Sequence, residues 1–165
     1  MVWRLLPLLV LCPPCQPSPC PSPSWQEAGS SCYLSSPSSL SWLAAKEFCA
    51  LQGGHLAEIG SQEEQELVTG LVGPDTYQWL GLTDRAHPGT WTWVHSHSQP
   101  HYTAWGPGQP DSSEQHCVFL WGAHEGLWAD FLCQVTSPPP SSFTWSCRRR
   151  RAPRATLYTP SVSWR

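Results

Sequence analysis

The amino-acid sequence predicts an α+β fold, because two helical segments are followed by a half that is rich in short strands and long loops. Apolar residues recur at helical spacing over residues 41–52 and again over residues 61–72. From Tyr77 onward the pattern changes to short runs of aromatic and β-branched residues, separated by stretches of Gly, Pro, Ser and His. Helices and strands that are segregated along the chain are typical of α+β domains.

Both predicted helices carry start and stop signals, and Gly73-Pro74 is the stop signal of the second. Ser41 can cap the first helix, and Gly53 can end it in a left-handed turn. Ser61 and Glu64 form the capping-box pattern at the start of the second helix. Cys49 lies on the apolar face of the first helix, so we expect its sulfur to point into the core.

The half of the chain after the second helix contains the predicted strands. They are Tyr77–Leu82, Thr90–Val94 and Cys117–Trp121, followed by a last strand-like segment at Phe143–Cys147. The connection between the second and third strands is long, and loops of that length usually carry function. A Pro/Ser-rich insert, Ser137-Pro-Pro-Pro-Ser141, precedes the last segment.

Charge is distributed unevenly along the chain, whose formal net charge is -3. All 12 acidic residues lie between Glu27 and Asp130, where Lys46 and Arg85 are the basic residues besides histidine. Six of the nine Lys and Arg residues lie in the range 148–165, which we therefore expect to be a solvated basic tail. The acidic body argues against a nucleic-acid partner.

The N-terminal segment, residues 1–19, is predicted to be a secretory signal peptide with a Pro-rich leader. Arg4 precedes the apolar run Leu5–Leu11, which is shorter than the ~20 apolar residues of a membrane-spanning helix. No other stretch is a candidate transmembrane segment, so we expect a secreted, extracellular protein. The sequence contains no Asn, which excludes N-linked sugars.

Cysteines in an oxidising compartment are expected to form disulfides. Six of the eight lie beyond the leader, namely Cys20, Cys32, Cys49, Cys117, Cys133 and Cys147. Six cysteines can pair in many ways, and their spacing alone does not select one. Metal binding is the weaker interpretation, because no close pair of cysteines is matched by a second close pair.

Six features of the chain occur in one characteristic order. They are Trp25 between Cys20 and Cys32, the segment Phe48–Ala57, Trp79-Leu-Gly-Leu82, Trp105-Gly-Pro-Gly-Gln-Pro-Asp111, Cys117, and Gly126-Leu-Trp-Ala-Asp130 with Cys133. Each feature is unspecific alone, but the complete series strongly resembles a C-type lectin-like domain over residues 20–147. The resemblance implies a C-type lectin-like fold of two helices and small antiparallel sheets with a long, irregular ligand loop.

The resemblance also implies a disulfide pattern, namely Cys20–Cys32, Cys49–Cys147 and Cys117–Cys133. The second of these bonds would tie the first helix to the last strand-like segment. In the family the last two cysteines are usually closer together, whereas the Pro/Ser-rich insert separates them here. The insert is either a surface loop, which chain entropy tolerates, or a cause of displacement of the last strand.

Members of this family often bind sugars through a calcium ion in the long loop. Gln109-Pro110-Asp111 resembles the galactose-type triplet, in which a cis Pro110 directs the flanking side chains at one ion. The resemblance places Gln109, Asp111, Glu114 and Asp130 around Ca2+, with Gln109 and Asp111 also contacting the sugar. Such oxygen ligands suit Ca2+. The implied function is calcium-dependent binding of galactose or N-acetylgalactosamine (GalNAc).

The chain departs from the family pattern at several positions of this site. Ala129 stands where sugar-binding members have Asn, and Gln115 stands where they have Glu. Galactose-type members also stack an aromatic ring on the sugar, and this chain has none between Asp111 and Cys117. The departures favour an alternative function, which is calcium-independent recognition of a protein on the same fold.

Other chemistries fit the sequence less well. No Gly-x-Ser-x-Gly motif or Ser/His/Asp spacing indicates a hydrolase, so we do not expect an enzyme. His95, His97 and His101 lie close together, but no carboxylate or Cys completes a zinc site. An auxiliary calcium site retains Asp84, while Pro88 stands where an acid is expected. The expected partner is therefore a glycan or an extracellular or cell-surface protein.

Overall fold

The computed structural model describes residues 20–36, 39–71, 74, 76–136 and 143–151. The predicted leader, the Pro/Ser-rich insert and the predicted tail beyond Arg151 lie outside the described residues. Within the described part, neither helix is long and apolar enough to cross a membrane.

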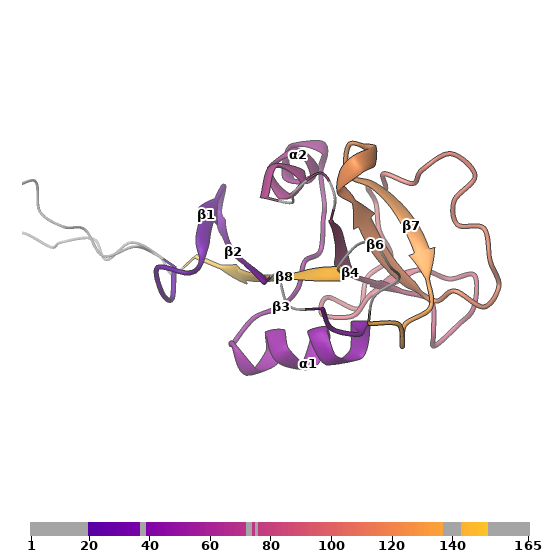
Figure 1. Ribbon diagram of the computed structural model, residues 1–165, viewed down its shortest axis with the longest axis horizontal. Helices are drawn as coiled ribbons and strands as arrows, with labels where there is room; N and C mark the ends of the chain where they lie inside the picture. The colour runs from indigo at the N-terminus through magenta and orange to yellow at the C-terminus, as the bar shows by residue number, and fades with distance from the viewer. Residues whose placement is uncertain (1–19, 37–38, 72–73, 75, 137–142, 152–165) are drawn as a thin grey trace, which may run out of the picture.

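The domain has the predicted α+β architecture (Figure 1). Its elements are β1 (Gln26–Ala28), β2 (Ser31–Ser36), α1 (Trp42–Leu51), β3 (His55–Leu56), α2 (Gln62–Leu71), β4 (Tyr77–Thr83), β5 (Thr92–Trp93), β6 (Cys117–Trp121), the 3-10 turn η1 (Gly122–His124), β7 (Leu127–Phe131) and β8 (Phe143–Arg150). Both helices and the four predicted strand-like segments are present. The strands β1, β2, β3 and β7 were not predicted, so strands precede the first helix as well as follow the second.

The described strands form one sheet in the order β1-β2-β8-β4-β6-β7, with β3 beside β8 and β5 beside β4. Strands β4 and β8 pair in parallel, and the other named pairs are antiparallel. The parallel pair therefore joins two small antiparallel groups into one sheet. In Figure 1 the helices α1 and α2 lie on opposite sides of the strands.

The helix caps follow the sequence signals, with one difference. The Ser41 hydroxyl accepts the Ala44 amide at 3.3 Å, and Gly53 ends α1 with a φ of 72°. The Ser61 hydroxyl accepts the Glu64 amide at 3.2 Å. The Glu64 carboxylate does not complete a capping box. One of its oxygens accepts the Gly60 amide at 3.0 Å, and the other accepts the Tyr33 hydroxyl and pairs with Arg148.

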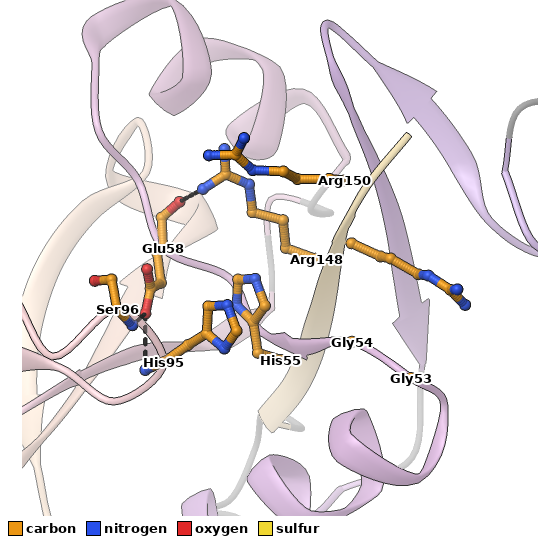
Figure 2. Close-up of a pocket in the computed structure, with 9 residues that line it drawn as sticks. Gly53, Gly54, His55, Glu58, His95, Ser96, Arg148 and Arg150 are labelled. Carbon is orange, nitrogen blue, oxygen red and sulfur yellow. Dashed lines mark hydrogen bonds between the residues drawn. The ribbon is translucent and has the colours of Figure 1, made fainter. Parts of the chain in front are cut away.

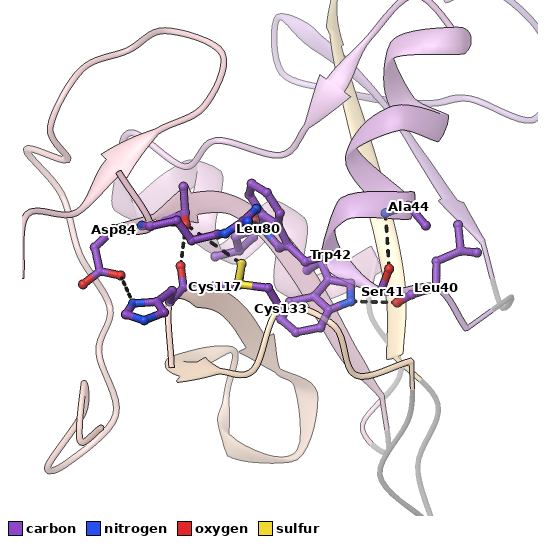
Figure 3. The surroundings of a disulfide bond; sticks show 12 residues. Leu40, Ser41, Trp42, Ala44, Leu80, Asp84, Cys117 and Cys133 are labelled. Carbon is purple, nitrogen blue, oxygen red and sulfur yellow. Dashed lines mark hydrogen bonds and ion pairs between the residues drawn. A yellow bond between two sulfur atoms is a disulfide. The ribbon is translucent and has the colours of Figure 1, made fainter. Parts of the chain in front are cut away.

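Three disulfides join the cysteines in the pairs that the resemblance implies, Cys20–Cys32, Cys49–Cys147 and Cys117–Cys133. The second disulfide links α1 to β8 across 98 residues of chain. Near the third, the Trp42 indole donates to the Leu80 carbonyl at 2.7 Å and ties α1 to β4 (Figure 3). The Cys49–Cys147 disulfide and the Trp42 indole thus anchor α1 to the sheet.

The last strand corrects the domain boundary that the sequence suggested. Strand β8 continues past Cys147 to Arg150, so the first arginines of the expected basic tail belong to the folded domain. Arg149 pairs with Cys32 in the β2–β8 register, and the Arg151 amide donates to the Ser30 carbonyl at 3.1 Å. Backbone pairing with β2 is therefore the physical reason for the extension.

Candidate functional site

The long loop between β5 and β6 is held against β7 by Trp128. The Gly106 amide donates to the Trp128 carbonyl at 2.8 Å, and the Trp128 amide donates to the Ala104 carbonyl at 2.7 Å. The buried indole donates to the Gln65 side chain at 2.8 Å, and Gln65 in turn donates to the Gly126 carbonyl at 2.7 Å. Trp128 therefore connects the loop, β7 and α2 at one point.

This clamp brings together three of the four residues predicted around the calcium ion. The Asp111 amide donates to one carboxylate oxygen of Asp130 at 3.1 Å, and the Ser112 amide donates to the other at 3.3 Å. The Gln109 carboxamide accepts the Asp130 amide at 3.3 Å and donates to the Asp111 carboxylate at 2.7 Å. The Gln109–Pro110 peptide bond is cis.

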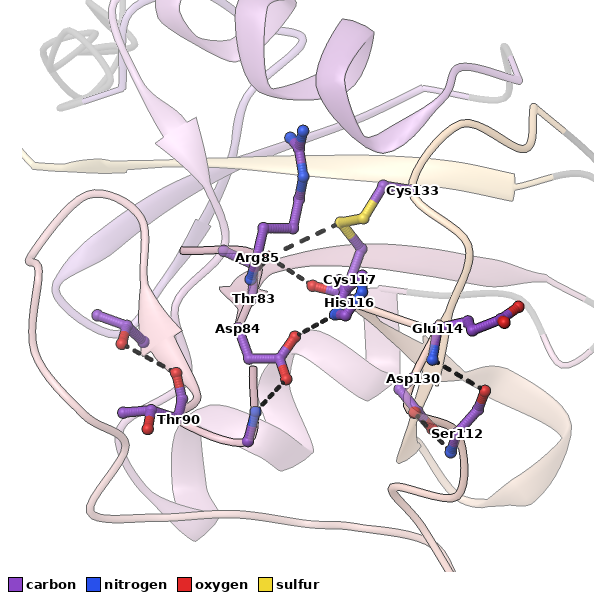
Figure 4. A network of polar contacts seen from close by, with 12 residues as sticks. Thr83, Asp84, Arg85, Thr90, Ser112, Glu114, His116, Cys117, Asp130 and Cys133 are labelled. Atoms are coloured by element: carbon purple, nitrogen blue, oxygen red, sulfur yellow. Dashed lines mark hydrogen bonds and ion pairs between the residues drawn. A yellow bond between two sulfur atoms is a disulfide. The ribbon is translucent and has the colours of Figure 1, made fainter. Parts of the chain in front are cut away.

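Glu114, the fourth predicted ligand, is not part of this cluster. It is exposed, and its amide donates to the Ser112 hydroxyl at 3.2 Å. Figure 4 shows its carboxylate pointing away from Asp130. The exposed loop that carries Glu114 gives its side chain no contact that would turn it inward.

The donor set does not fit a calcium ion. Ca2+ takes about six to eight oxygen ligands, several of them carboxylates. Both carboxylate oxygens of Asp130, which is 2% exposed, already accept backbone amides, and the Gln109 oxygen accepts another. Ala129 offers no side-chain oxygen. Among the described residues, no three His, Cys, Asp or Glu side chains are grouped so that they could hold a metal ion.

The expected auxiliary calcium ligand is also engaged by the protein itself. Asp84 is buried, and its carboxylate accepts the Gly89 amide at 2.7 Å and contacts the His116 ring nitrogen Nδ1 at 2.8 Å (Figure 4). These contacts hold the connection between β4 and β5 against the residue before β6. Asp84 therefore has a structural role.

A cavity of about 280 Å³ opens beside the Gln109 cluster, lined by Pro107, Gln109, Trp121, His124 and Leu127 among others. The Trp121 and His124 rings lie 3.6 Å apart between their centroids, with an interplanar angle of 42°. His124 is exposed and Trp121 is half-buried. The cavity therefore combines aromatic rings on one wall with a carboxamide on another.

The sequence did not predict this aromatic wall, because the family pattern places the stacking ring between Asp111 and Cys117. Trp121 comes from the end of β6 and His124 from the turn that follows, on the far side of the loop. Glu125 adopts a left-handed conformation, with a φ of 54°, where this turn ends. The sequence signal for this wall is His124, which follows three residues after Trp121, the aromatic residue at the end of a predicted strand.

Comparison with protein families matches residues 38–138 to the C-type lectin domain. Asialoglycoprotein receptor 2 of Rattus norvegicus is 34% identical over 136 residues, which cover 78% of this chain and 42% of the receptor. A perlucin-like protein of Mytilus galloprovincialis is 30% identical over 124 residues, covering 72% of this chain and 79% of that protein. The chain thus spans about two fifths of the length of the receptor that it matches.

Solved structures show the same fold. The carbohydrate-recognition domain of the mouse scavenger receptor C-type lectin superposes with a TM-score of 0.72 and 29% identity, covering 81% of this chain and 99% of that domain. A calcium-independent type II antifreeze protein superposes with a TM-score of 0.71 and 27% identity, covering 81% and 95%. The relatives named here are lectins and binding domains, not enzymes.

Proposed function

The chain belongs to the C-type lectin domain family, and we propose that it is an extracellular, non-catalytic glycan-binding domain that holds one sugar ring without a bound calcium ion. The observation that carries the proposal is the hydrogen bonding of the Asp130 carboxylate. Two amides of the chain occupy its oxygens, so the loop at Asp111 is held in place by the protein's own groups. The likeness to a calcium-independent type II antifreeze protein supports a role for this fold without calcium.

The cavity beside Gln109 has the chemistry that a sugar ring needs. Its volume of about 280 Å³ lies near the lower end of the range for small-molecule pockets, ~300–1,000 Å³, and suits a ligand of one ring. The apolar face of a sugar can pack against the Trp121 and His124 rings. Its hydroxyls can bond to the Gln109 carboxamide, which lines the cavity and donates to the exposed Asp111 carboxylate nearby.

Galactose and GalNAc are the sugars we propose first. The Gln109-Pro110-Asp111 triplet resembles the galactose type, and the relative of similar sequence is named asialoglycoprotein receptor 2. A neutral sugar also suits this site, because the Asp111 and Asp130 carboxylates would repel an acidic one. If a glycan screen finds no binder, recognition of a protein at the same face becomes the favoured function.

Two single substitutions test the site. We expect Gln109→Ala to weaken glycan binding about tenfold, because it removes a ligand-facing amide and frees the Asp111 carboxylate from its bond. Glu114→Gln is the matched control, which should bind as the wild type does. The measurement is the dissociation constant for the best glycan of an array. Loss of binding in both variants would instead support the calcium site that the sequence implies, because that site includes both side chains.

A further inference from the structure

A second cavity, of about 390 Å³, lies away from the Gln109 cluster, where β3 and the end of β8 meet the loop after β5 (Figure 2). Its charged and titratable lining residues are His55, Glu58, His95, Arg148, Arg149 and Arg150. We call it the arginine–histidine pocket. None of the residues proposed to contact the sugar ring lines it.

Arg148 forms a rigid wall of this pocket, because its guanidinium is fully engaged. It pairs with the Glu64 carboxylate at 2.8 Å, donates to the Glu58 carbonyl at 2.9 Å and donates to the Ser31 hydroxyl at 3.2 Å. The Tyr33 hydroxyl also donates to Glu64, at 2.5 Å. The charge of Arg148 is therefore already balanced within the fold.

Arg149 and Arg150 carry the charge that is available to a ligand. Both are exposed, and within the described part of the chain neither forms an ion pair. Figure 2 shows Arg150 extending beside Arg148 toward Glu58. The Arg149 guanidinium lies close to Gly53, in the turn after α1. A Cβ atom placed on Gly53 would be 3.2 Å from the Nη1 atom of Arg149. Both residues line the pocket, but successive residues of a strand point to opposite faces, so Arg150 shares the face of Arg148 and Arg149 lies on the other.

The acid that lines the pocket, Glu58, is largely buried and bonded to the backbone. Glu58 is 7% exposed, and one of its carboxylate oxygens accepts the His95 and Ser96 amides at 2.9 and 3.0 Å. This bonding holds the loop after β5 and stabilises the negative charge of Glu58 locally. The accessible lining is therefore cationic, although the body of the domain is acidic.

Two histidines complete the wall. The His55 and His95 rings stack with centroids 3.8 Å apart and an interplanar angle of 4°. The His55 Nδ1 atom donates to the Leu56 carbonyl at 2.8 Å, since a carbonyl only accepts. Burial chiefly lowers the pKa of His55; His95 and Arg148 lower it further, while the Leu56 carbonyl and Glu58 raise it. A bound anion would favour the protonated ring.

We propose that the arginine–histidine pocket binds a sulfate or phosphate ester group carried by a glycan. Guanidinium groups match the oxygens of such tetrahedral anions through paired N–H donors. The His55 ring supplies additional positive charge when it is protonated. This site is separate from the proposed neutral-sugar site, and anion binding here does not depend on sugar binding there.

The test uses two probes on the purified, oxidised chain, a heparin tetrasaccharide and a hexose 6-phosphate, at ~150 mM salt to screen long-range attraction. We expect Arg149→Gln/Arg150→Gln to weaken the binding of whichever probe the wild type binds at least tenfold, which is about the effect of one charge-assisted hydrogen bond. The control Lys46→Gln/Arg85→Gln removes the same charge outside the pocket and should retain binding. Unchanged melting temperatures establish that both variants fold.

Two results would overturn the proposal. One is the absence of binding to either probe, and the other is an equal loss in both double variants, which would indicate unspecific attraction. Binding of the sulfated tetrasaccharide, whose charge does not change over this range, is expected to be tighter at a pH of about 5.5 than at about 7.5, because the anion and His55 protonation favour each other; an unchanged affinity would contradict the role given to His55. Arg149→Gln/Arg150→Gln should bind galactose or GalNAc as the wild type does, which separates this site from the proposed function.

Discussion

Replacing both Cys49 and Cys147 by Ser is expected to lower the free energy of unfolding by about 4–5 kcal/mol. The bond closes a loop across 98 residues, and in the chain-entropy model a long loop gives the largest stabilisation. Both cysteines are fully buried, so the serine hydroxyls would also enter the core. Because many domains are stable by only ~5–15 kcal/mol, the variant should be largely unfolded near body temperature.

The Cys20→Ser/Cys32→Ser variant is the matched comparison. Its bond spans 12 residues, so the same model gives a loss of about 3 kcal/mol. Urea unfolding, followed by tryptophan fluorescence, measures both variants under non-reducing conditions. A smaller loss in the Cys49/Cys147 variant than in the Cys20/Cys32 variant would contradict the attachment of β8 to α1 as the main staple of the fold.

Trp128→Ala is expected to cost about 3–5 kcal/mol, the range for large-to-small changes of a buried aromatic residue. The side chain is fully buried and packs edge-to-face with Trp93, Tyr102 and Trp105, in each case at 5.9 Å between centroids. The substitution also leaves the Gln65 carboxamide oxygen without its indole donor. Because Trp128 holds the long loop on β7, glycan binding should be lost as well.

Trp128→Phe separates packing from hydrogen bonding at this position. It keeps most of the apolar volume but removes the donor to Gln65, for which we expect a loss of about 1–3 kcal/mol. The free energy of unfolding by urea measures both effects. A Trp128→Ala variant that is as stable as Trp128→Phe would contradict the stabilisation attributed to the packing of this ring.

The helices and the cysteine bonds could be predicted because their signals are local or belong to a recognisable series. Ser41 and Ser61 cap their helices through hydrogen bonds within one turn, and such bonds depend on neighbouring residues. The strands β1 and β3 are too short to show a period of two. Strand β1 forms in a hairpin with the neighbouring β2, and β3 forms because β8 offers a backbone partner from a distant part of the chain.

The site could be predicted in part, for the same reason. Gln109, Asp111 and Asp130 meet as the resemblance implies, but their oxygens are engaged by amides whose positions depend on the folded loop. The bond from Trp128 to Gln65 joins residues 63 positions apart, and nothing in the sequence marks that pair. Likewise, an arginine run reads as a solvated tail until backbone pairing with β2 places it in a strand.

The central claim is that this domain binds a neutral sugar without calcium. The most direct measurement is the dissociation constant of the purified, oxidised domain for galactose or GalNAc, determined once with millimolar calcium and once after EDTA. Because the Asp130 carboxylate is bonded by the amides of Asp111 and Ser112, we expect the same constant in both conditions. Sugar binding that appears only with calcium would contradict the account.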